Sequence, residues 1–134
     1  MKYNISPFDP DFKQESSQTD RDDLLNYLNN RFGIWRYTER AREAIKIALS
    51  YYKLSNDDVV TILTTSGNSY ISSCVTNAIE AFCKWSRDII PETKVIFVNH
   101  EFGYPYDGLE MLRKIGLPII EDCAYSFFTD SIDE

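Results

Sequence analysis

The stretch KVIFVNHEFGYPYDGLEMLRKIGLPIIEDCAYSFF, residues 94–128, decides the fold. Residues 94–98 are β-branched or aromatic after the opening lysine, which is typical of a buried strand. Residues 107–115 then carry apolar side chains at the spacing of one helix face. Gly116 is suited to end this helix and Pro118 cannot extend it, so a second strand is predicted to begin there. The stretch therefore predicts a strand–helix–strand unit.

Two acidic residues, Glu121 and Asp122, come directly after the apolar part of the second strand. A carboxylate that leaves an apolar strand loses hydration unless a cation or a hydrogen-bond donor meets it. In open α/β sheets, ligands bind at the carboxyl ends of the strands. The pair therefore indicates a ligand-binding edge, with two solvated loop acids as the alternative.

The preceding sequence alternates helix and strand patterns in the same way. An acidic first turn opens a predicted helix over residues 20–28, and Thr38 is the predicted N-cap of a helix that runs to about Lys53. Residues 59–63 are typical of a strand, and residues 69–85 have helical spacing. Strands that alternate with helices predict an α/β fold, here a three-layer parallel-sheet fragment with helices on both faces.

The domain organisation follows from the same patterns. Residues 1–19 are mostly polar and irregular and predict an N-terminal arm, whereas residues 20–134 predict a single α/β domain. Three predicted strands make a small parallel sheet, and the sequence ends shortly after the acidic pair. We therefore expect the front part of a larger fold.

Composition excludes several classes of function. The chain has 134 residues, 43% of them hydrophobic and 14% aromatic, which suffices for a globular domain with a core. A net charge of −7 argues against nucleic acid or an anionic membrane as the main partner. The sequence shows neither a membrane-spanning apolar run nor a signal-peptide core. Three scattered cysteines and a single histidine argue against a zinc site and a catalytic triad, and they predict reduced thiols in a cytoplasmic protein.

Two loops that follow predicted strands could line a site. Residues 66–69, Ser-Gly-Asn-Ser, could hold an anion at a helix N-terminus, although they lack the full glycine-rich patterns; an ordinary connecting loop is the alternative. Residues 100–105, His-Glu-Phe-Gly-Tyr-Pro, form either a site-lining loop or a structural turn in which His100 is hydrogen-bonded.

The loop 100–105, the helix 107–115 and the sequence Glu121-Asp122-Cys123-Ala124 together resemble the DegT/StrS group of nucleotide-sugar aminotransferases. The pattern of that family is a His, a Gly and often a Pro after one strand, then a helix, then Glu-Asp-x-Ala-Gln after the next strand. The resemblance covers about residues 37–128. It implies the large-domain fold of the fold type I enzymes, pyridoxal phosphate as cofactor, and amino transfer to a nucleotide-linked keto sugar. It also implies a homo-oligomer with active sites at the subunit interface.

The resemblance implies cofactor-binding roles for several residues. Asp122 matches the carboxylate that pairs with the pyridine nitrogen and keeps it protonated, so that the ring can accept electrons. Ala124 matches the small residue on the ring face, and Tyr125 stands where the family usually has a Gln near the ring hydroxyl. Tyr70 is the candidate for the aromatic side chain that stacks on the ring, and His100 lies in the matching loop.

Two departures from the family pattern affect the expected activity. Ala41 and Arg42 stand at the Gly-Thr pair that holds the phosphate; an arginine can bind phosphate as a fork, but the lost glycine closes off backbone approach. The lysine that binds the cofactor covalently has no match among the lysines of this sequence, so no catalytic residue is predicted. We expect a truncated or degenerate enzyme that is inactive as this chain alone. The alternative is a non-catalytic binding or structural module that keeps the fold.

Overall fold

The computed structural model describes residues 18–126, so nearly all of the predicted arm lies outside the described part of the chain. The chain divides into two compact units, residues 1–37 and 38–134. The first contains α1 (Gln18–Phe32), after which Gly33 adopts a positive φ of 64° and donates its N–H to Asn29 O. The sequence predicted one domain from residue 20, whereas the structure separates α1 from the sheet at Tyr37. No helix in the described range is both long and apolar enough to cross a membrane.

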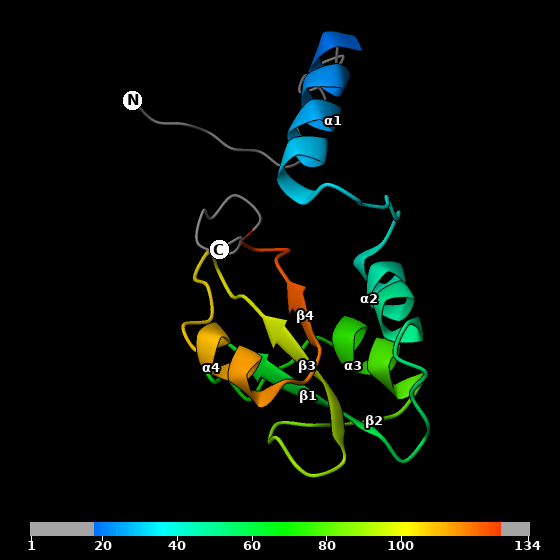
Figure 1. The fold of residues 1–134 in the computed structure, drawn as a ribbon, viewed down its shortest axis with the longest axis vertical. Coiled ribbons are helices and arrows are strands. Elements are labelled where there is room, and N and C mark those ends of the chain that lie inside the picture. The colour runs from blue at the N-terminus through cyan, green and yellow to red at the C-terminus, as the bar shows by residue number, and fades with distance from the viewer. Residues whose placement is uncertain (1–17, 127–134) are drawn as a thin grey trace. The chain divides into compact units, whose positions relative to one another are not determined.

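The second unit is built on a four-stranded sheet in the order β2-β1-β3-β4 (Figure 1). The strands are β1 (Val59–Thr64), β2 (Lys84–Ser86), β3 (Thr93–Asn99) and β4 (Ile119–Asp122). Every neighbouring pair is parallel. The central strands β1 and β3 are almost wholly buried, as their β-branched sequences predict. The predicted parallel α/β sheet is therefore confirmed.

Helices cover both faces of this sheet. α2 (Ala41–Ser50) and α3 (Ser73–Glu80) pack on one face, and α4 (Leu109–Ile115) packs on the other (Figure 1). The larger core cluster joins α2 and α3 to side chains such as Ile62 and Phe97, and the smaller one joins α4 to Ile96 and Val98. Alternate residues of β3 thus supply the two cores, as the side-chain period of a strand requires.

Three sequence predictions about element boundaries are wrong. Arg40, not Thr38, is the N-cap of α2, because the Thr38 hydroxyl donates to Arg40 O at 3.3 Å instead of capping a helical N–H. α3 is shorter than the predicted 69–85, since Ser72 caps its start by accepting the Cys74 N–H. The residues predicted as its end form the edge strand β2, which was not predicted.

The connections leaving β1 and β3 diverge at the carboxyl ends of these strands. The chain leaves β1 towards α3 on one face and leaves β3 towards α4 on the other. Neighbouring strands whose connections part in this way form a topological switch point, where ligands of open α/β sheets bind.

Candidate functional site

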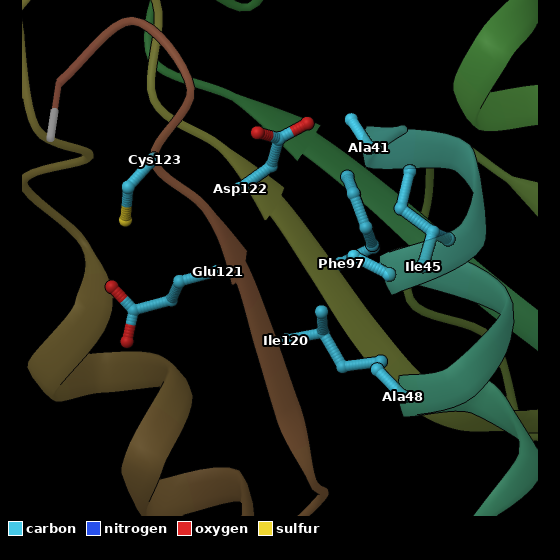
Figure 2. Close-up of a pocket in the computed structure, with 9 residues that line it drawn as sticks. Ala41, Ile45, Ala48, Phe97, Ile120, Glu121, Asp122 and Cys123 are labelled. Atoms are coloured by element: carbon cyan, nitrogen blue, oxygen red, sulfur yellow. The ribbon is translucent and has the colours of Figure 1, made fainter. Parts of the chain in front are cut away.

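A cavity of about 220 Å³ lies between the start of α2 and the carboxyl end of β4 (Figure 2). Small and apolar side chains on one side of α2 form one wall, and Phe97 and Ile120 form the floor. Residues 121–123 border it where β4 ends. Because Ala41 and Ala44 carry only a methyl group, the first turn of α2 leaves space in front of the strand end.

Asp122 is the acidic group on this side of β4. Figure 2 shows its carboxylate on the α2 side of the strand, near Ala41. Oδ1 accepts the Ala124 N–H at 3.0 Å, which fixes the carboxylate in the turn after the strand. No described residue donates a hydrogen bond to Oδ2. One carboxylate oxygen of Asp122 is therefore available to a donor that enters the cavity.

Glu121 points to the opposite face, because successive side chains of a strand alternate (Figure 2). Its Oε2 lies 2.9 Å from Nε2 of His100, whose side chain is completely buried. His100 Nδ1 accepts the Tyr106 N–H, also at 2.9 Å. A backbone N–H can only donate, so Nδ1 carries a lone pair and the proton of the neutral ring is on Nε2. Nε2–H thus donates to Glu121 and ties the end of β4 to the β3–α4 loop.

The tautomer of His100, with its proton on Nε2, does not suit a metal ion at that nitrogen. The ligand atoms of His100, Glu121 and Cys123 lie within 4.8 Å of one another, close enough to surround an ion. A metal bound at Nε2 would need the lone pair of that nitrogen, and the ring would then have to carry its proton on Nδ1. That proton would face the Tyr106 N–H. The hydrogen bonds of His100 therefore suit a link between the end of β4 and the β3–α4 loop better than a metal site.

The loop over residues 66–69, for which an anion at a helix N-terminus was one expectation, is hydrogen-bonded to an acidic side chain of the same chain. The Ser66 N–H and hydroxyl both donate to Oε2 of the buried Glu101, at 3.0 and 2.5 Å. The Thr65 hydroxyl donates to Tyr104 O at 2.8 Å and accepts the Glu101 N–H. Helix α3 begins only at Ser73, so its N-terminus takes no part in this binding. These contacts fasten the β1–α3 loop to the β3–α4 loop.

The other predicted cofactor-binding residues are not among those that line the Asp122 cavity. Tyr70 and Tyr125 are 73% and 70% exposed, and the Tyr125 ring packs against Phe102 at 5.9 Å between centroids. Ala124 is exposed in the turn after β4, and His100 is buried on the α4 side. Of the six predicted residues, the structure thus places Asp122 alone on the wall of the cavity.

Arg42 connects the first turns of two helices. Its Nη2 donates to Cys74 Sγ at 3.5 Å, so the guanidinium lies between the start of α2 and the start of α3. That hydrogen bond, the bond with Ser72 and the guanidinium charge hold the pKa of the exposed Cys74 thiol below its usual range. The Arg42 guanidinium therefore adds one positive charge beside the first turns of α2 and α3, where the backbone carries partial positive charge.

Sequence reasoning missed Glu101 and Arg87, which both anchor the β1–α3 loop. Each is separated in sequence from its partner loop, so no local pattern marks the contact. Position was the one available signal for Glu101, which follows a predicted strand. Arg87 follows β2, which was not predicted, so no signal marked it.

Comparison with known proteins supports the fold. Neither a family model nor a curated protein matches this chain. Among solved structures, the chain is similar to an aminotransferase, TlmJ from Streptoalloteichus hindustanus, with 24% sequence identity and a TM-score of 0.53. The match covers 63% of this chain and only 28% of that aminotransferase. The sheet and its helices thus have an aminotransferase-like fold, in agreement with the predicted fold class.

Proposed function

We propose that this chain is the ring-holding part of a pyridoxal-phosphate-dependent aminotransferase of the DegT/StrS kind, in which the full protein acts on a nucleotide-linked keto sugar. The proposal rests on Asp122, which borders a cavity at the carboxyl end of a strand and whose Oδ2 accepts no hydrogen bond from residues 18–126. The aminotransferase-like fold is consistent with it.

The residues present fit the two ends of the cofactor. Oδ2 of Asp122 can accept a hydrogen bond from a protonated pyridine nitrogen, and a negative charge beside that nitrogen favours its protonated form. The phosphate suits the start of α2, where Glu43 and Ala44 donate the first backbone bonds, both to Arg40 O. The N–H groups of Ala41 and Arg42 precede those bonds, and the Arg42 guanidinium lies close by. When bound, the cofactor supplies an electron sink for a carbanion.

The described residues orient the cofactor but supply no base for proton transfer. None of the residues described around the cavity is a lysine. Asp122 would hold the ring nitrogen, and Ile120 and Phe97 would exclude water from below it. We therefore propose that this chain alone does not catalyse amino transfer, since loss of a covalent nucleophile and base removes orders of magnitude in rate. The same lack of a lysine favours the second candidate, a binding module that keeps the fold without the chemistry.

Binding can be tested without interference from surface lysines by titrating the protein with pyridoxamine phosphate, which has no aldehyde. We expect weak, saturable binding that Asp122→Ala weakens by about tenfold or more, the value of one charged hydrogen bond. Asp107→Ala is the matched control, because it removes an exposed acid at the start of α4. Equal binding by wild type and Asp122→Ala would exclude the proposed role of Asp122.

The absence of activity needs a separate measurement. The protein is mixed with pyridoxal phosphate, reduced with borohydride and examined by mass spectrometry, and turnover of an amino donor is followed in parallel. We expect no stoichiometric adduct on a single lysine and no turnover. A specific adduct with turnover that Asp122→Ala abolishes would show that another lysine performs the chemistry.

A further inference from the structure

A second cavity, of about 470 Å³, lies at the carboxyl end of β1. Leu63 and Tyr106 in its wall belong to the core cluster of α4, so it opens on the sheet face opposite to the Asp122 cavity. Its volume is in the range of small-molecule sites. It also lies at the switch point between β1 and β3, where the fold favours ligand binding.

Arg87 is the basic residue of this cavity, and its guanidinium is only partly bonded. Nη2 donates to Thr64 Oγ1 at 3.2 Å and to Asn68 O at 2.8 Å, which fixes the group over the end of β1. Nη1 is buried and has no hydrogen-bond partner in the described part of the chain. A buried charged donor that lacks an acceptor is costly, and native proteins seldom leave one in that state.

The hydroxyl groups beside Arg87 indicate which kind of ligand atom would suit this cavity. Ser66 and Thr65 are already donating, to Glu101 and to Tyr104 O. The buried Thr64 hydroxyl accepts from Arg87 and so retains a hydrogen to donate. The hydrogen-bond donors at this cavity that have no acceptor among the described residues thus include Nη1 of Arg87 and the hydroxyl of Thr64, and an oxygen atom could accept from both.

The surrounding charge selects among oxygen acceptors. Asp88 also lines the cavity, and the chain as a whole has a net charge of −7. Asp88 offsets the positive charge of Arg87, so a dianion would be repelled more strongly here than a monoanion. We propose that this cavity binds the carboxylate group of a small molecule, with Arg87 and Thr64 as its donors. The proposal does not depend on the cofactor site, because the two cavities share no residue.

The probe for this site is acetate, titrated into ¹⁵N-labelled protein while chloride is withdrawn to hold the ionic strength constant. We expect saturable amide shifts at Thr64, Gly67 and Arg87 in the wild type. Arg87→Gln should weaken binding by at least about tenfold. Lys94→Gln is the control, since it removes one exposed positive charge at the amino end of β3 and should leave binding unchanged.

If Arg87→Gln does not fold, Thr64→Val serves as the second variant and should also weaken binding. A wild type that shows no saturable shift at these amides would mean that water alone fills the cavity, and the proposal would fail. Saturable binding that neither variant weakens would likewise overturn it. A parallel titration with inorganic phosphate tests the choice of ligand, since tighter binding of phosphate than of acetate would contradict a carboxylate site.

Discussion

Replacing His100 with phenylalanine tests the hydrogen-bonded link between β4 and the β3–α4 loop. Phenylalanine keeps a flat ring in the completely buried position but removes both nitrogens. Two contacts are lost: the bond from Nε2 to the Glu121 carboxylate and the bond from the Tyr106 N–H to Nδ1, each 2.9 Å long. A bond to a charged group contributes about 1.5–3 kcal/mol, and an unsatisfied N–H costs about 1–3 kcal/mol.

The expected loss in the free energy of unfolding is therefore about 2.5–6 kcal/mol, a large part of the roughly 5–15 kcal/mol typical of a domain. The measurement is urea-induced unfolding of the full chain, followed by circular dichroism, with the m-value checked for constancy. Glu121→Gln should cost less, about 1 kcal/mol, because the amide oxygen still accepts from Nε2–H.

A double-mutant cycle then isolates the pair. His100→Phe should cost less in the Glu121→Gln background than in the wild type, because the charge-assisted bond is already weakened. A loss below about 1 kcal/mol for His100→Phe alone would refute the reasoning. Equal losses in the two backgrounds would show that His100 is not coupled to the charge of Glu121, and would contradict a charge-assisted bond between them.

Two further outcomes follow from single positions. Gly116→Ala should lower the free energy of unfolding by about 1 kcal/mol in the same assay, because Gly116 has a φ of 79°. A Cβ at this position would meet no atom within 4 Å, so the loss would come from the backbone conformation and not from a clash. An unchanged free energy of unfolding would contradict the left-handed cap. Cys74 should react with iodoacetamide at neutral pH faster than Cys83, since the Arg42 hydrogen bond lowers the pKa of the first thiol and burial raises that of the second. Arg42→Gln should slow Cys74 and leave Cys83 unchanged, and an equal effect on both would refute the assignment.

The sheet was predictable from sequence because its central strands are buried on both sides. Residues 59–63 and 94–98 read as continuous β-branched and aromatic runs, and a glycine in the left-handed conformation ends α4 where its pattern stops. The edge strand β2 was not predictable. It has three residues and pairs with one neighbour, and two of its side chains are exposed, so burial imposes no pattern on it.

The sequence pattern marked the strand end at which the Asp122 cavity lies, but it did not indicate the hydrogen bonds around that strand end. The acidic pair marked the end of β4, and the structure places Asp122 at a cavity there. The hydrogen bonds of His100 and Glu101, however, join loops that are 21 and 35 residues apart in sequence. Such contacts depend on strand order and register, which residue patterns within one loop do not contain. The same reason hid Arg87, which follows β2 and whose partners lie at and beyond the end of the neighbouring strand β1.

The alternation along β4 has a consequence for how this sequence can change over time. Glu121 and Asp122 are both carboxylic acids, and they differ in surroundings because their side chains lie on opposite faces of the sheet. Glu121 bonds His100 on one face, and Asp122 borders the cavity on the other. Insertion or deletion of one residue within β4 would reverse that parity, placing the carboxylate that now borders the cavity on the His100 face and the carboxylate that now bonds His100 on the cavity face. The number of residues from Pro118 to Asp122 therefore decides which of the two acids meets which face of the sheet.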